Sequence, residues 1–169
     1  MWLVFCEARF FVKYRNEYFD NEKKKRQEWK KEHDAGGFKC SHCKQWVVIN
    51  SYMGTVNRNH CNICLWSKHV DENKGDRKAE CHGGMRPIGL TFKHEGTGRQ
   101  GEIMLIHECA GCGVISINRI AADDDNEMLL AIYRESHSNQ NRQDSLSAQH
   151  IRILTLEDES EVNVQLFGR

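Results

Sequence analysis

The chain has no long hydrophobic run and no net charge. Its 24 basic side chains balance its 24 acidic ones, which argues against the strongly basic composition of a protein that coats nucleic acid. No segment has the length and apolar character of a membrane span. The apolar start, residues 1–6, is too short for an export signal, lacks basic residues, and is stopped by Glu7 and Arg9. We therefore expect a cytoplasmic protein that does not associate with membranes.

The zero total conceals an uneven distribution of charge along the chain. Lysine and arginine outnumber aspartate and glutamate by 9 to 7 in residues 1–38 and by 10 to 7 in residues 39–112. In residues 113–169 the balance reverses to 5 against 10. An asymmetry of this kind would orient the molecule on a polyanion.

Cysteine is the most informative residue type, with eight in 169 positions. Without an export signal, these cysteines indicate metal in a reducing compartment rather than a disulfide framework. The Cys-x-x-Cys pair Cys40 and Cys43 precedes a second pair, Cys61 and Cys64. Together they supply the four thiolates of a closed tetrahedral zinc site. The order knuckle, apolar hairpin, second knuckle and short helix is typical of a treble clef, with the second pair at the helix start.

A second metal constellation follows in the sequence. Cys109 and Cys112 lie between two strand-like runs, residues 103–106 and 114–117, as in a zinc-ribbon knuckle. Cys81 is the third ligand by arithmetic, and a closed site then needs a histidine. The candidates are His69, His107, His82 and His60. We favour His69, because it leads towards Cys81 and leaves the first site undisturbed, with His107 as the alternative. Cys6 remains over and is expected to be a small buried apolar residue.

A series of short segments around the cysteines carries a further signal. In order, they are Phe38-x-Cys40-x-x-Cys43, Arg58-Asn59-His60-Cys61-x-x-Cys64-Leu65, Ser67-Lys68-His69-Val70-Asp71, Gly75-Asp76-Arg77, Cys81, Met85-x-Pro87-Ile88, Cys109-x-x-Cys112-Gly113 and Asn118-Arg119-x-Ala121. In these segments the chain resembles a known family, the RNHCP-domain proteins. The resemblance covers roughly residues 37–130 and departs from the family name at Asn62, where the name has proline. It implies a zinc-binding domain and no settled biochemical activity.

These signals predict a small α+β zinc-binding domain with a treble-clef or zinc-ribbon core and two bound zinc ions. We expect four segments: an N-terminal extension with a charged helix (1–36, the helix over about 16–34), the two-zinc domain (37–137), a polar linker (138–149) and a C-terminal β-hairpin (150–169). Residues 123–126 are expected to cap a short helix over residues 127–135. The alternating residues Ile151, Ile153, Val162 and Val164 favour the hairpin.

The favoured function is a non-enzymatic, zinc-stabilised RNA-binding module associated with the ribosome. Its partners would be ribosomal RNA and neighbouring ribosomal proteins, with no small-molecule substrate. The candidate RNA contacts are Lys24, Lys25, Arg26, Trp29, Arg58, Lys68, Arg77, Lys78 and Arg99. Solvated helix faces and local ion pairs are the structural alternative for these side chains.

Two other function classes remain open. A treble-clef nuclease or DNA-binding module would use His60 to activate water beside a divalent ion. The sequence shows no dedicated acidic or histidine set for such an ion near His60. A zinc-dependent protein-interaction module would instead dock through the apolar residues of the C-terminal segment.

Overall fold

The computed structural model describes residues 34–49, 51–54, 58–73, 75–94 and 100–168, together with Asp20, Lys24, Gln27 and Lys31. These last four residues and Asp34 are helical and exposed, in agreement with the helix expected over residues 16–34. The rest of that helix lies outside the described residues. No helix of the described part is long and apolar enough to cross a membrane.

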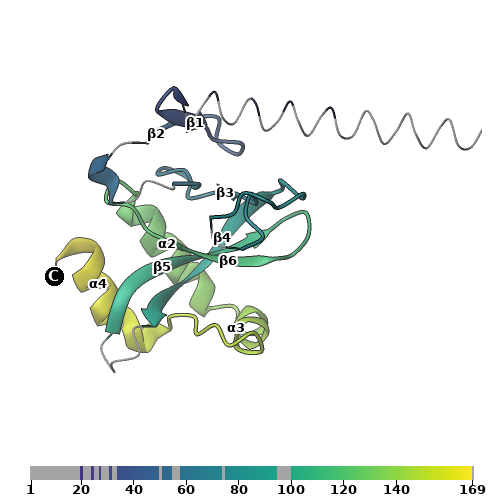
Figure 1. Cartoon of the computed structure of the whole chain (residues 1–169). Helices are drawn as coiled ribbons and strands as arrows, with labels where there is room; N and C mark the ends of the chain where they lie inside the picture. Colours follow the sequence, from purple (N-terminus) through teal and green to yellow (C-terminus); the bar gives the residue numbers. More distant parts are fainter. Residues whose placement is uncertain are drawn as a thin grey trace, which may run out of the picture.

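The described strands form two antiparallel sheets (Figure 1). The smaller sheet pairs β1 (Gly37–Lys39) with β2 (Trp46–Val48). The larger sheet has the order β3-β4-β5-β6. Its strands are β3 (Ser67–Lys68), β4 (Gly84–His94), β5 (Gln100–Cys109) and β6 (Ile115–Arg119). A short 3-10 helix, Ser51–Met53, follows the smaller sheet.

Helix α2 (Asn126–His137) covers one face of the larger sheet and packs on β4. It begins at Asp125, whose side chain accepts a hydrogen bond from the backbone N–H of Met128 at 3.0 Å. This cap satisfies one of the free N–H groups of the first turn. The prediction of a capped helix over residues 127–135 is therefore confirmed, with slightly wider bounds.

The hydrophobic core lies between this helix and the sheet. Residues of β4 and β5 meet residues of α2 and of the C-terminal segment, and most of them are fully buried. A smaller cluster lies beside it under the next helix. The main core contains Leu65, Leu90, Ile103, Leu105, Leu129, Leu130, Ile132, Tyr133, Leu154, Val162 and Leu166.

The predicted polar linker is wrong, because residues within 138–149 form a helix. Helix α3 (Gln140–Ser147) begins at Asn139, whose side chain accepts from the backbone N–H of Arg142. One apolar residue of this otherwise polar helix attaches it to the protein. Leu146 is 2 % exposed and packs in the smaller cluster with Ile88 and Ile153. One buried leucine in a polar run gives no helical period, so the pattern alone favoured a linker.

The predicted C-terminal β-hairpin is also wrong. The segment forms a 3-10 turn, Leu156–Asp158, and helix α4 (Glu159–Phe167). Thr155 is the residue before this turn, and its backbone N–H donates to the side chain of Asp158 at 2.8 Å, in a capping box. Val162 and Leu166 are buried while Val164 is 49 % exposed, so the spacing of four prevails over the spacing of two. In Figure 1, α4 lies against the sheet and α2, where it completes the main core.

No helix follows the second knuckle either. Leu65 and Trp66 lead directly into β3, which pairs with β4. The structure is a small α+β zinc-binding fold as predicted, but its knuckles lie in hairpins, as in a zinc ribbon, and the treble-clef helix is absent from residues 61–73. A short knuckle followed by a polar stretch is compatible with either outcome, and pairing with β4 decides it.

The two leucines near the start of the C-terminal turn test this arrangement. Leu154 is fully buried, whereas Leu156 is 64 % exposed. We expect Leu154→Ala to lower the free energy of unfolding by about 2–5 kcal/mol, because it leaves a cavity in the main core. Leu156→Ala, the matched control, should change it by less than about 0.5 kcal/mol. Urea unfolding of the zinc-loaded protein measures both, and a larger effect for Leu156 would contradict the observed packing.

Candidate metal centres

The first metal centre brings together all four cysteines of the two Cys-x-x-Cys pairs. The Sγ atoms of Cys40 and Cys64 lie 3.6 Å apart, as do those of Cys43 and Cys61. All four sulfurs lie within 4.8 Å of one another. A disulfide would need about 2.05 Å, so these are free thiols. Four sulfurs about 2.3 Å from a tetrahedral zinc are about 3.8 Å apart, and the observed spacing fits that geometry.

Three turns of the chain share one knuckle geometry. In each, the first cysteine donates its backbone N–H to the carbonyl five residues on, at 2.8 or 2.9 Å. Its carbonyl accepts from the residue four positions on, whose φ is positive. The turns span residues 40–45, 61–66 and 109–114, with Lys44 (φ 66), Leu65 (φ 58) and Gly113 (φ 74) in the left-handed position. This turn points both sulfurs to one side.

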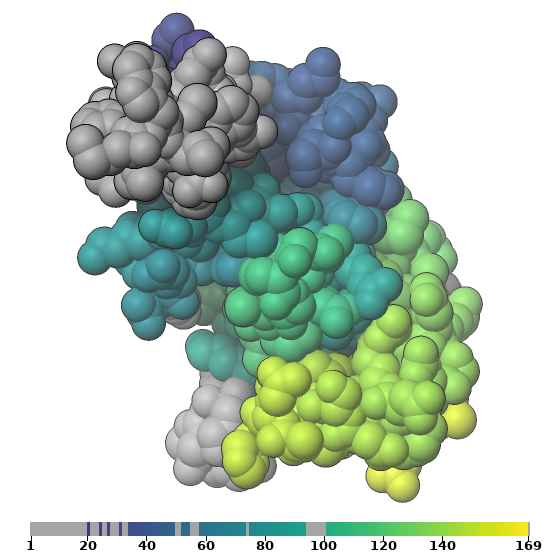
Figure 2. All heavy atoms as spheres, turned by 90° about the vertical axis from the view of Figure 1, so that its right-hand side faces the viewer, coloured from purple at the N-terminus to yellow at the C-terminus, as the bar shows by residue number. Residues whose placement is uncertain are grey.

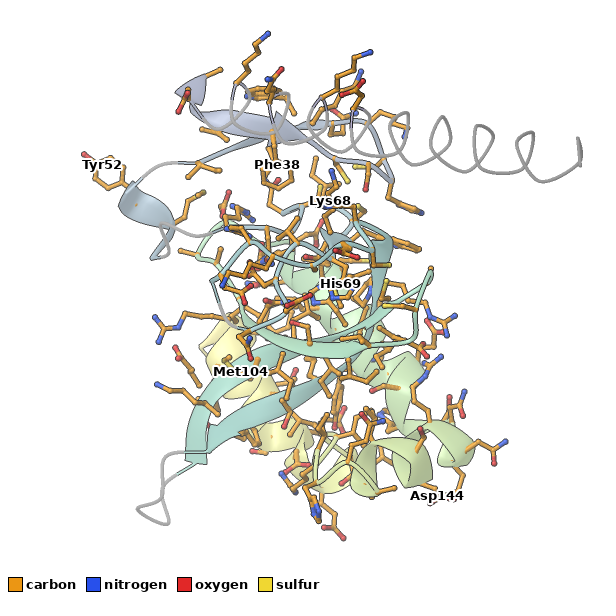
Figure 3. All side chains as sticks on the ribbon, turned by 45° about the vertical axis from the view of Figure 1, so that its right-hand side comes forward. Phe38, Tyr52, Lys68, His69, Met104 and Asp144 are labelled. Carbon is orange, nitrogen blue, oxygen red and sulfur yellow. The ribbon has the colours of Figure 1, made fainter. Side chains whose placement is uncertain are left out.

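The second metal centre combines one such knuckle with two residues from separate segments. Cys81 and Cys109 have Sγ atoms 3.6 Å apart, and Cys112 Sγ lies 3.3 Å from His69 Nδ1. These four ligand atoms also lie within 4.8 Å of one another. The two clusters are therefore positioned to bind two zinc ions, as predicted, and His69 is the histidine that the structure brings to the second one. Figure 3 labels His69 in the interior of the molecule, below Phe38 and Lys68.

The backbone around the second centre leaves room for the sulfurs. A β-carbon added at Gly83 would lie 2.8 Å from Cys109 Sγ and 3.2 Å from Cys81 Sγ. One added at Gly111 would lie 3.1 Å from Cys81 Sγ. A side chain at Gly83 would therefore force the ligand sulfur to shift, and one at Gly111 would crowd Cys81; neither glycine has a positive φ.

The thiols also favour a cation chemically. Burial raises the pKa of Cys61, which opposes ionisation of a thiol already surrounded by other sulfurs. Burial raises the pKa of Cys64 as well. A divalent ion offsets this cost by giving each thiolate a positive partner. The residues present thus fit zinc in number, element and spacing.

His107, the alternative ligand, has both ring nitrogens in use elsewhere. It is completely buried, its Nε2 lies 2.7 Å from the carbonyl of Leu65 and its Nδ1 lies 2.9 Å from the side-chain amide of Asn118. Burial lowers its pKa to about 3. The neutral ring therefore donates from Nε2 to Leu65 and accepts at Nδ1 from Asn118. His107 ties the second knuckle to β5 and belongs to neither cluster.

The segment before the second knuckle forms a buried ionic network. Arg58 is 2 % exposed and its guanidinium donates to Asp124 at 2.5 Å and to Asp123 at 2.6 Å. His60 Nε2 lies 2.8 Å from the other carboxylate oxygen of Asp124. Asp124 also accepts from the backbone N–H of Ala121 at 2.7 Å. This carboxylate therefore joins the second knuckle to the loop before α2.

This burial corrects the expectation that Arg58 contacts RNA. Its side chain has no exposed surface and its charge is already matched by two carboxylates. His60 is 1 % exposed and bonded to Asp124, which does not favour the alternative in which it activates water. No local pattern identifies the partner of Arg58, because Asp124 lies 66 positions further along the chain, in a segment expected to cap a helix.

The other candidate RNA contacts fall into three groups. Lys24 and Lys78 are exposed and Lys68 is half-buried. The guanidinium of Arg77 lies 3.5 Å from the carboxylate of Asp71. This loop therefore contains a local ion pair, formed with Asp71 and not with the adjacent Asp76. The remaining candidates lie outside the described residues: Lys25, Arg26, Trp29 and Arg99.

Two basic residues that the sequence reasoning passed over are exposed beside the first centre. Lys39 and Lys44 flank its first knuckle. Trp46, interpreted as part of an apolar hairpin, is 47 % exposed, whereas its neighbour Val47 is fully buried. The available signal was the alternation of burial in a short strand, which turns Trp46 outward when Val47 faces the cysteines.

Two cysteine clusters held by hairpin knuckles define a zinc-binding domain of the zinc-ribbon type. The family model described as the RNHCP domain matches residues 35–130. Because this match covers more than half of the chain, the protein belongs to the RNHCP family, a cysteine-rich zinc-binding domain family. No curated protein and no solved structure matches the chain.

The zinc content of cysteine and histidine variants tests the assignment of ligands. We expect two zinc ions per chain by elemental analysis of purified protein. Cys61→Ser should leave only the second centre loaded, and His69→Ala only the first, because a closed site loses affinity when one of four ligands is removed. Cys6→Ser is the control and should retain both ions. Retention of two ions in His69→Ala would contradict its role as a ligand.

The two aspartates of the ionic network provide a matched pair for stability. Asp124→Ala leaves the Arg58 charge buried without its main partner, which should cost about 3–5 kcal/mol of unfolding free energy. Asp123 is 43 % exposed on its side chain, so Asp123→Ala should cost about 1 kcal/mol or less. Chemical unfolding of both zinc-loaded variants measures the difference. Equal losses would show that Asp124 does not hold the network together.

Proposed function

We propose that the zinc-bearing end of this protein binds RNA, with ribosomal RNA in an assembled ribosomal particle as its ligand. The observation that carries the proposal is the placement of four lysines. Three of them adjoin a metal ligand in the sequence and the fourth lies three residues before Cys81. They are Lys39, Lys44, Lys68 and Lys78.

None of these four lysines forms an ion pair within the described part of the chain. Several basic side chains elsewhere are paired: Arg86 with Glu108, Arg119 with Glu102 and Arg152 with Asp158. Arg134 and Arg142 form no ion pair among the described residues, but neither adjoins a metal ligand. Unpaired ammonium groups keep their full charge for a ligand, and a polyphosphate ligand releases its counterions when it meets them. The zinc-bearing end is therefore the part of the described molecule suited to a polyanion.

The opposite end has the opposite charge balance. Figure 2 shows the segment of the first centre at one end of the molecule and the C-terminal helical region at the other. The C-terminal residues 113–169 carry twice as many acidic as basic side chains. This distribution directs the metal-bearing end towards RNA and the acidic end away from it or towards basic neighbouring proteins.

The knuckle turns are suited to RNA recognition, because bound metal would hold each of them in one conformation. Structured RNA is recognised through its phosphates, its shape and its unpaired bases, and short loops reach these features. Two metal centres fix the loops, so little conformational entropy is lost on binding. The proposal requires no chemistry from His60, which is buried in the ionic network, and we place the protein among non-enzymatic binding modules of the cytoplasm.

Sedimentation of cell lysate through sucrose gradients tests this function. We expect the wild-type chain to migrate with ribosomal particles at low salt and to leave them at high salt or after RNase treatment. Replacing the four lysines by alanine should abolish the association, because it removes the phosphate contacts, while both zinc ions are retained. Each phosphate contact contributes about 0.7–0.9 to the slope of log affinity against log salt.

The control variant removes four positive charges that adjoin no metal ligand in the sequence, through Arg86→Ala, Arg119→Ala, Arg134→Ala and Arg142→Ala. It should associate nearly as well as the wild type. Migration of the wild-type chain only at the top of the gradient would contradict the proposal. Equal losses in both variants would show that charge alone, rather than the zinc-bearing end, determines the association.

A further inference from the structure

The outer face of the β1 and β2 hairpin carries an exposed aromatic ring beside a lysine. Lys39 and Trp46 are directly paired in the register of the two strands, so their side chains lie on the same face. Phe38 and Val47 occupy the other face and pack on the cysteines of the first centre, as Figure 3 shows for Phe38. The hairpin therefore has one face buried on the metal centre and one face open.

Gly37 holds the indole of Trp46 close to the backbone. A β-carbon at Gly37 would lie 2.8 Å from both Cε2 and Nε1 of the ring, so only glycine allows this contact. One side of the ring thus rests on the chain, while 47 % of the residue stays exposed. A ring supported in this way loses little freedom when a ligand stacks on it.

Trp66 shows what an internally used tryptophan looks like in this fold. Its ring stacks on His42 with centroids 4.2 Å apart and an angle of 2° between the planes. On Gly84 of β4, an added β-carbon would lie 3.3 Å from the same ring. Trp66 therefore joins the two knuckles to the larger sheet. Trp46 has no such ring partner among the described residues.

The charge around Trp46 selects the class of ligand. Residues 35–49 contain Lys39 and Lys44 but no aspartate or glutamate, and both lysines are exposed. An aromatic surface with flanking ammonium groups matches a nucleotide, whose base stacks while its phosphate meets the lysine. A base inside a duplex has both faces covered by its neighbours, so the ring requires an unpaired one.

We propose that the outer face of this hairpin is a stacking site for one unpaired RNA base, with Trp46 against the base and Lys39 against its phosphate. This inference rests on the proposed RNA-binding function and names the part of the RNA that the first centre contacts. The first zinc site acts as the rigid mount of the ring, because Cys40 follows Lys39 directly and Cys43 precedes Trp46 by three positions.

Fluorescence anisotropy with the full-length, zinc-loaded chain tests the site. The probes are a fluorescein-labelled ten-nucleotide single-stranded RNA of mixed sequence and its blunt duplex. We expect Trp46→Ala to weaken single-strand binding by about 5- to 100-fold, the range for loss of one stacked base. Trp46→Phe should restore binding to within about threefold, since phenylalanine also stacks. Lys39→Ala should lower the salt slope by about 0.7.

Two variants with exposed apolar residues serve as controls. Val48 lies on the same face and is 51 % exposed, and Ile117 on β6 is 41 % exposed. Val48→Ala and Ile117→Ala should both bind as the wild type does. Each variant is checked for two zinc ions and for an unchanged unfolding midpoint, so that misfolding is not taken for loss of contact.

The outcomes separate the site from the function. Single-strand binding that survives Trp46→Ala unchanged overturns the stacking site and leaves the RNA-binding function in place. Losses of equal size in Trp46→Ala and Val48→Ala, without rescue by phenylalanine, also overturn it and indicate a general apolar surface suited to a protein. Failure of the wild-type chain to bind either probe or ribosomal particles removes the function and the site together.

Discussion

The close approach of four ligand sulfurs is the constraint on which the first half of the domain depends. Thiolates 3.6 Å apart repel one another unless a cation lies between them. The surrounding structure offers little else, because β1 and β2 have three residues each and Val47 is the only fully buried side chain of that pair. Sheets this short are marginal in water. Ligation therefore supplies most of the stability that a larger apolar core would otherwise provide.

The second half is organised in the ordinary way, around apolar residues between a sheet and its helices. The two halves are joined by the pairing of β3 with β4, by Leu65 in the main core and by buried polar contacts. Asp124 receives Arg58 and His60 from the second knuckle, and the backbone N–H of Asp125 donates to the carbonyl of Asn62 at 2.9 Å. The Arg-Asn-His motif that marks the family thus connects, in this chain, the metal-dependent part to the part built on a hydrophobic core.

The sequence was most informative where chemistry restricts the choice of residue. Cysteine pairs have few uses in a chain of this kind, so their spacing predicted the first cluster and half of the second. Cys81 was added by elimination, and His69 was the favoured one of four candidate histidines. The C-terminal segment was different, because its apolar residues alternate as in a strand, yet Ile151 and Ile153 lie in no strand and Val164 lies in helix α4. Val162 and Leu166 pack at a spacing of four because α2 and the sheet present apolar residues to them, and that tertiary contact cannot be read from the local pattern. Likewise, the partner of Arg58 lies 66 positions away and gives no local sign.

The order of the ligand residues along the chain also determines which metal centre is complete first while the polypeptide is being synthesised. All four ligands of the first centre lie between residues 40 and 64, and its knuckle hydrogen bonds are complete by Trp66. The second centre needs Cys112, and the carboxylate that receives Arg58 and His60 comes later still. During synthesis from the N-terminus, the first metal is available to nucleate structure before the hydrophobic half exists. Asp124 then closes the junction last, so the buried arginine is matched only once both metal-binding segments have been made.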